Sequence, residues 1–166
     1  MRHVISAMVE NKVGVLSHIA GLFSSRGFNI DSLTVGRTES PDLSRMTIVV
    51  VGDDRILEQV RKQLGKVIDV VKVTDYAGRD IVQRDLALVK INAPASKRRE
   101  IHTLVEIFRG KVVDISQNDM VVELSGPENK VEAFVEMAHP YGIKELVRTG
   151  VVAMARGEHK EFVEAT

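Results

Sequence analysis

Apolar residues in the N-terminal half follow two alternating spacings, one typical of strands and one typical of helices. Residues 3–9 are mainly apolar and predict a strand. A helix is predicted next, because apolar residues recur at i, i+3, i+4 and i+7. These residues are Leu16, Ile19, Ala20 and Phe23. Gly27 follows the pattern and is expected to end the helix as a C-terminal cap.

The rest of this half adds three strands and a second helix. Within residues 28–35 the apolar phase shifts by one position, which predicts a bulge or a bent edge strand. We expect a continuous apolar strand at 46–51, a helix from about Asp54 and a closing strand at 67–75. One face of that helix carries Ile56, Leu57, Val60 and Leu64. The predicted order of elements is βαββαβ.

The same order recurs after residues 77–84, a polar segment without clear periodicity that we interpret as a linker. The elements predicted beyond it are a strand at 86–93, a helix ending near Gly110, strands at 111–116 and 120–125, a helix beginning at Pro127, and a last strand at 143–155 interrupted at Gly150. The two halves have no visible sequence similarity, so the repeat concerns only the order of elements.

Two βαββαβ units predict an α+β protein with two ferredoxin-like domains, each an antiparallel sheet with its helices on one face. We assign residues 1–76 to the first domain, 77–84 to the linker and 85–166 to the second domain. Interior strands such as residues 46–51 are apolar in both phases, so the sheet face opposite the helices needs a cover. The sequence leaves three sources for that cover: the other domain, a second chain, or another protein.

Composition and charge narrow the range of partners. Of the 166 residues, 44% are apolar and 28% are charged, the balance of a soluble globular protein. Lys and Arg number 23, as do Asp and Glu, so no net field favours nucleic acid or an anionic membrane. Cysteine is absent and no apolar run is long enough to span a bilayer. We expect a cytoplasmic protein with neither a nucleic-acid nor a membrane partner.

Catalytic and metal-binding patterns are missing. None of the five histidines has the spacing of a metal-binding helix, and no Cys completes a zinc site. No G-x-S-x-G turn places a serine for nucleophilic attack. The basic run at residues 97–99 lacks interleaved aromatic residues, so we interpret it as a solvated helix face. The sequence therefore predicts no catalytic residue and no metal ligand.

The turn at residues 11–14 is the strongest candidate for ligand binding. It has neither the G-x-G-x-x-G of a dinucleotide site nor the Gly-Lys-Ser/Thr of a phosphate loop. A helix start that follows such a turn presents free N–H groups, which bind a carboxylate without a basic side chain. Asn11 can add a hydrogen bond to an ammonium or a carboxylate, so an amino acid fits. Spacing alone leaves open that Asn11 and Gly14 only shape the turn.

Several long segments resemble one known family. They are G-L-F-S-S-R-G-F-N-I-D-S-L-T-V at 21–35, L-S-R-M-T-I at 43–48, L-E-Q-V-R-K-Q-L-G-K-V-I-D-V-V-K-V at 57–73, L-V-K-I at 88–91, E-I-F-R-G at 106–110 and R-T-G-V-V-A-M-A-R-G at 148–157. Together with the N-x-x-G-x-L turn, they resemble the acetolactate synthase small subunit family, whose first domain is an ACT domain. The resemblance spans nearly the whole chain.

The resemblance implies a regulatory role. In that family the large subunit is the catalyst and holds thiamine diphosphate, Mg and FAD, so no cofactor is expected in this chain. The small subunit raises the activity of the large subunit and confers feedback inhibition, usually by valine, in branched-chain amino acid biosynthesis. A stand-alone amino-acid-sensing scaffold or adaptor, without an acetolactate synthase partner, is the alternative.

The resemblance also implies a place for the effector, which is valine, leucine or isoleucine. Family members form homodimers whose ACT sheets join side by side, with the effector at the junction. Carried over by position, one chain would supply Asn11, Gly14, Val15 and Leu16, and the other Asn29 and Ile30. The corresponding turn of the second half, residues 92–96, has no glycine, so a second identical site is not expected.

Overall fold

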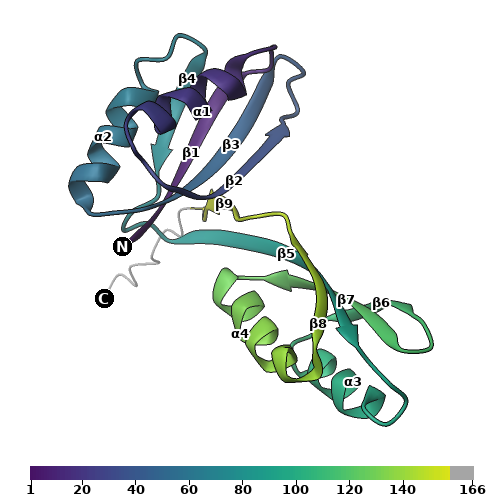
Figure 1. Cartoon of the computed structure of the whole chain (residues 1–166). Coiled ribbons are helices and arrows are strands. Elements are labelled where there is room, and N and C mark those ends of the chain that lie inside the picture. The colour runs from purple at the N-terminus through teal and green to yellow at the C-terminus, as the bar shows by residue number, and fades with distance from the viewer. Residues whose placement is uncertain (158–166) are drawn as a thin grey trace, which may run out of the picture.

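A computed structural model describes residues 1–157 and contains two βαββαβ units followed by one further strand (Figure 1). The first unit consists of β1 (Arg2–Glu10), α1 (Val15–Ser25), β2 (Ile30–Arg37), β3 (Leu43–Val51), α2 (Asp54–Leu64) and β4 (Val70–Asp75). The second consists of β5 (Ile81–Asn92), α3 (Arg98–Ile107), β6 (Lys111–Ile115), β7 (Asp119–Gly126), α4 (Glu128–Ala138), a 3-10 turn η1 (His139–Tyr141) and β8 (Ile143–Arg148), before β9 (Val152–Ala155). The predicted α+β fold and order of elements are confirmed.

The first sheet has the strand order β2-β3-β1-β4, and all its neighbouring strands are antiparallel. Both helices cover one face of this sheet (Figure 1), where alternate residues of β1 and β3 are buried against them. The order makes β2 an edge strand, and its register shifts between Ile30 and Ser32. The predicted irregular edge strand is therefore confirmed.

Helix α1 shows one difference from the predicted pattern. Its buried residues are Val15, Ile19 and Phe23, whereas Leu16 is 48% exposed. Ile19 and Phe23 are buried as predicted, but the predicted Leu16 and Ala20 are exposed, because the buried face runs along Val15, Ile19 and Phe23. Gly27, with φ +67, follows the end of α1 as expected.

The second sheet has the order β6-β7-β5-β8 and its own core, formed with α3 and α4. Phe108 and Phe134 meet edge to face in this core, with ring centroids 5.5 Å apart. Gly150 has φ +87 and separates β8 from β9, which matches the predicted interruption of the last strand.

The segment interpreted as a linker, residues 77–84, is in large part a strand. Strand β5 begins at Ile81, and residues 81–84 pair with β9 from Arg84↔Val152 to Ile81↔Ala155. The prediction failed because the apolar pair Ile81-Val82 is short and flanked by polar residues, and because the partner strand lies at the other end of the second half. Only the turn around Gly78, with φ +69, is irregular.

The second half covers part of the bare face of the first sheet. Val49 faces away from the helices and is only 1% exposed, as is Val151 just before β9. The N–H of Val151 donates to Ser32 Oγ at 3.0 Å, and Thr34 Oγ1 donates to the carbonyl oxygen of Val151 at 3.2 Å. Of the three possible covers for this face, the structure shows the other half of the same chain.

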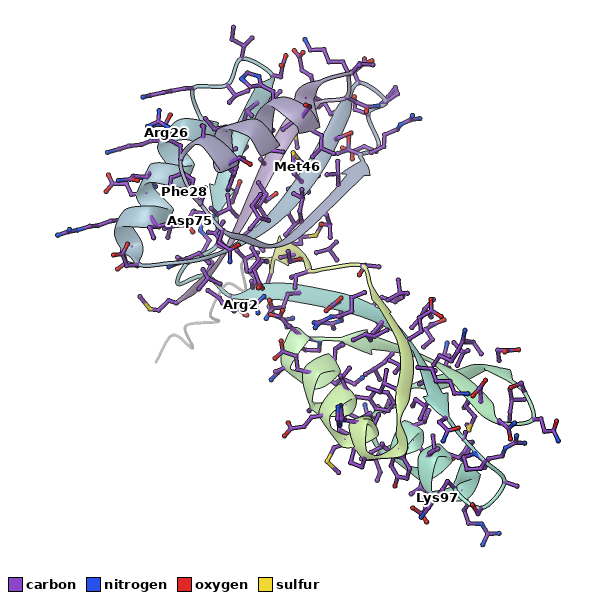
Figure 2. The ribbon with its side chains drawn as sticks, in the orientation of Figure 1. Arg2, Arg26, Phe28, Met46, Asp75 and Lys97 are labelled. Carbon is purple, nitrogen blue, oxygen red and sulfur yellow. The ribbon has the colours of Figure 1, made fainter. Side chains whose placement is uncertain are left out.

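One ion pair, Arg2–Glu128, joins the two halves beside this contact, and a second pair, Arg148–Asp85, lies within the second half. Arg2 on β1 lies between the two halves (Figure 2) and contacts Asp31 and Glu128, at 2.6 Å each. Arg148 Nε donates to Oδ2 of the buried Asp85 at 2.8 Å. Because a buried carboxylate is stable only with a partner, this pair favours one position of β8 against β5.

Within residues 1–157, no helix has both the length and the apolar character needed to cross a membrane.

Candidate effector site

The turn from β1 to α1 leaves the start of the helix open. Gly14 adopts the left-handed conformation, with φ +90 and ψ −14, and caps α1 without a side-chain hydrogen bond. Its carbonyl oxygen accepts the N–H of His18 at 2.9 Å, which begins the helical hydrogen bonding. The N–H groups of residues 15–17 therefore have no partner inside the helix. A Cβ built on Gly14 meets no atom of residues 1–157 within 4 Å, so the space beside the turn is open at Gly14.

Asn11 is fixed at the base of this turn. Its N–H donates to the carbonyl oxygen of Asp42 at 2.8 Å, and its Nδ2 donates to that of Pro41 at 3.0 Å. Within residues 1–157 no donor is bonded to Asn11 Oδ1. Because the side-chain amide nitrogen is engaged, the free oxygen suits Asn11 to accept a hydrogen bond from an ammonium group. The sequence analysis assigned no role to Pro41 and Asp42, although Ser40-Pro41-Asp42 is a sequence typical of turns.

Lys12 does not supply positive charge to the helix start. Its Nζ contacts Glu10 and lies 2.9 Å from Asp69 Oδ1. Hydrogen bonds to Glu10 and then Asp69 raise the pKa of Lys12 above its usual range, so the ammonium stays bound to these carboxylates. An anion at the helix start would therefore rely on backbone donors.

The apolar residues at the helix start differ in what they can contact. Val15 is buried in the core of the first half, so only its backbone N–H is available to a ligand. Leu16 is half exposed, and its side chain lies at the surface of the first helical turn. Val13, in the turn itself, is fully exposed.

Asn29 and Ile30 lie at the opposite end of α1, where the chain enters the edge strand β2. Asn29 is exposed, and Ile30 is partly buried against the core. Because α1 has 11 residues and a helix rises 1.5 Å per residue, this end is about 16 Å from Gly14. The structure thus brings Asn11, Gly14, Val15 and Leu16 together, and it leaves Asn29 and Ile30 apart from them within one chain.

The concave surface beside Asn11 does not include the helix start. A hollow of ≈ 310 Å³ is lined by Glu10, Asn11, Lys12, Asp42, Leu43 and Val71. Neither Gly14 nor Leu16 lines it, and neither do Asn29 or Ile30. The predicted residues therefore do not form one enclosed pocket in a single chain.

The part of the chain that the structure describes has no group of three or more His, Cys, Asp or Glu residues arranged to hold a metal ion.

Comparisons with known proteins agree with this architecture in both halves. Residues 5–72 match the family model described as AHAS small subunit-like ACT domain, and residues 84–157 match the model described as small subunit of acetolactate synthase. A probable acetolactate synthase small subunit of Archaeoglobus fulgidus is 54% identical over 96% of this chain and 100% of its own length. The acetolactate synthase small subunit of Bacillus subtilis is 49% identical over 97% of this chain and 94% of its own.

A solved structure is similar along the whole length. The crystal structure of the acetolactate synthase small subunit from Thermotoga maritima superposes with a TM-score of 0.88 at 44% identity, over 96% of this chain and 99% of that one. Matches in sequence and in structure thus extend over both halves. The chain belongs to the acetolactate synthase small subunit family, and its N-terminal half is an ACT domain.

Proposed function

We propose that this chain is a regulatory subunit that binds valine, or a related branched-chain amino acid, between two copies of its ACT domain. The ligand-bound state inhibits a catalytic large subunit, whose activity the chain otherwise raises. Membership of a small-subunit family implies that catalytic partner. The observation that carries the proposal is the open helix start at Gly14, where the first backbone donors have no partner inside the helix and the space beside Gly14 is open.

The chemistry of the turn suits a free amino acid. The N–H groups of residues 15–17 can bind the α-carboxylate, because a helix start combines free donors with the positive end of the helix dipole. Asn11 Oδ1 can accept from the α-ammonium group. The exposed side chain of Leu16 offers an apolar contact for the branched side chain of the ligand.

A homodimer would bring the predicted residues at the start of α1 in one chain close to Asn29 and Ile30 of the other chain. Strand β2 is an edge strand, and antiparallel pairing with β2 of a second copy joins two sheets side by side. The two-fold axis of such a pair sets the start of α1 in one chain beside the end of α1 in the other. Asn29 and Ile30 of the second copy then face Gly14 and Leu16 of the first.

The expected affinity is that of a metabolite sensor. Burial of the isopropyl group contributes about 1.5–3 kcal/mol, and a carboxylate at a helix start adds about 0.3–2 kcal/mol. Charge-assisted hydrogen bonds contribute about 1.5–3 kcal/mol each, and the loss of ligand freedom offsets part of the sum. The balance corresponds to roughly micromolar to millimolar dissociation constants.

Regulation requires that the ligand prefer one arrangement of the dimer. A ligand shifts a conformational equilibrium only by its difference in affinity for the two states. A site shared by two chains meets this condition, because its size depends on how the chains are placed. The thiamine diphosphate, Mg and FAD of the reaction belong to the large subunit in this proposal, and the complex is cytoplasmic.

The proposal is tested by titrating the purified chain with valine, leucine and isoleucine in a calorimeter, then reconstituting it with the large subunit. We expect saturable binding, a dimer in sedimentation, and inhibition of acetolactate formation by the amino acid that binds. A monomer that binds none of the three contradicts the proposal. Binding without any association with a large subunit would instead indicate the stand-alone sensor or adaptor.

A further inference from the structure

A groove lies on the side of the first sheet opposite its helices, between that sheet and the ribbon of β5 and β9. Its volume is ≈ 370 Å³. It is lined by the arginines Arg37, Arg45 and Arg84 and by apolar residues that include Val35, Val152 and Met154. We call it the arginine groove. Among residues 1–157, no Asp or Glu lines it.

The three arginines have few partners among residues 1–157. Arg45 donates to Ser6 Oγ at 3.0 Å, and Arg84 donates to the carbonyl oxygen of Gln83 at 2.7 Å. None of the three has a carboxylate within 4.0 Å in residues 1–157, whereas Arg2, Arg148 and Arg156 each do. A guanidinium has five N–H donors, so most donors in the groove have no acceptor from the described part of the chain.

Exposed apolar side chains border the same groove. Val152 is 50% exposed and Met154 is 65% exposed. Met and Arg are enriched in protein interfaces, and Lys and the acidic residues are depleted there. The composition of the groove is therefore that of an interface with an acidic and apolar partner.

Both halves of the chain build the groove, and β2 links it to the proposed effector site. Residues 34–37 of β2 line the groove, and Asn29 and Ile30 stand at the other end of the same strand. Residues 82–84 and 152–154 come from the second half. A change in the position of β2 would therefore change the shape of the groove.

We infer that the arginine groove docks an acidic segment of the catalytic large subunit, with apolar side chains of that segment against Val152 and Met154. The inference rests on the proposed function, which supplies the partner. A segment of protein suits the groove better than a small metabolite, because the apolar residues form an exposed border rather than an enclosure. A second copy suits it less, since two-fold pairing along β2 brings together two grooves of like charge.

The inference explains how one strand can serve regulation. An amino acid bound at Asn29 and Ile30 would act on the beginning of β2, and the large subunit would contact its end. Binding at either site then changes affinity at the other by the same factor, because coupling between two sites is reciprocal.

The test uses the full chain and its large subunit. Arg37→Glu with Arg84→Glu reverses two exposed charges in the groove, and Arg99→Glu reverses an exposed charge on α3 as a matched control. We expect the double variant to lose about a hundredfold or more in affinity for the large subunit. Its binding should also depend less on salt than that of the wild type. The control should bind as the wild type does, and Met154→Ser should cause a smaller loss.

Calorimetry and sedimentation separate the possible failures. The double variant should still bind valine and remain a dimer. Wild-type affinity of the double variant for the large subunit would overturn the inference while leaving the proposed function intact. Dissociation of the double variant into monomers would assign the groove to a second copy, which also overturns it. If the wild-type chain itself does not associate with a large subunit, the result contradicts the proposed function, and the inference about the groove fails with it.

Discussion

The turns that lead from the first strand into the first helix occupy the same topological position in the two halves but are built differently. In the first half, Gly14 leaves the start of α1 open, and no atom lies within 4 Å of the position of a Cβ. In the second half, the side chain of Arg98, the first residue of α3, bonds to the preceding loop and to the hairpin of β6 and β7. Its Nε donates to the carbonyl oxygen of Ala93 at 3.1 Å, and its Nη2 contacts the carbonyl oxygens of Ser116 and Gln117.

This difference shows how one fold can use an equivalent turn for binding or for stability. The N–H of Ala93 donates to the carbonyl oxygen of Asn118 at 2.6 Å, so the second turn is also tied to the hairpin of β6 and β7. Residues 97–99 were interpreted as a solvated helix face, and for Arg98 that interpretation is wrong. Neither helix start has a side-chain cap, but only the second turn has an arginine that donates to neighbouring backbone carbonyl groups and so ties the turn to the rest of its half.

The strongest test of the comparison places a charge in the open turn. Gly14→Asp should reduce valine binding by about a hundredfold or more, because a fixed carboxylate repels that of the ligand. The fold should persist, since a side chain has room there. Gly14→Ala is the control for the φ of +90, which costs about 1–2 kcal/mol for a residue with a Cβ. If calorimetry finds equal valine affinity in Gly14→Asp and Gly14→Ala, the effector does not bind at this turn.

The matching test in the second half removes Arg98. Arg98→Ala should lower the free energy of unfolding by about 2–4 kcal/mol, because three backbone carbonyl groups lose a charged donor. Urea denaturation measures the loss, and valine binding should stay unchanged. Arg98→Lys keeps the charge but not the forked geometry and should recover only part of the stability. A stable Arg98→Ala variant with weaker valine binding would mean that the second turn serves the ligand.

A smaller effect is expected at the other end of α1. Asn29→Ala should weaken valine binding by about tenfold, the value of one hydrogen bond near a charged group. The dimer should remain intact in sedimentation. If Asn29→Ala instead gives monomers, Asn29 serves assembly rather than ligand binding.

The smallest effect concerns a surface pair that belongs to neither turn. Lys62 Nζ lies 2.8 Å from Glu58 Oε1 on α2, and its hydrogen bond and charge lower the pKa of Glu58. A lowered pKa stabilises the folded state at pH values above the unfolded pKa of Glu, and the effect disappears as pH falls through the folded value. Lys62→Met should therefore lower Tm slightly at pH 7 and converge with the wild type in acid. A gap in Tm that stays constant with pH would show that the ion pair is not its cause.

Most of the individual elements could be predicted from local patterns. The face of α2 formed by Leu57, Val60 and Leu64 is buried as its spacing predicted. The phase shift in residues 28–35 corresponds to the register shift after Ile30. These predictions succeeded because a strand or helix that buries one face must repeat its apolar residues with the period of its own backbone.

Other features could not be predicted from local sequence patterns. Val15 rather than Leu16 is buried, because two adjacent apolar residues fit a helical period almost equally well and packing on β1 and β3 selects one. Residues 81–84 hold a short apolar pair, Ile81 and Val82, next to polar residues, and their pairing with β9 makes them part of a strand.

The sequence by itself determined the two βαββαβ units, the glycine at the first helix start and the absence of known catalytic motifs, because each depends on residues near one another in the chain. Tertiary structure alone decided that Val151 covers the first sheet, that Arg98 closes the second turn, and that Arg37, Arg45 and Arg84 share one groove. Those contacts join residues far apart in the sequence. Their pairing depends on how the sheets dock, which no local period specifies.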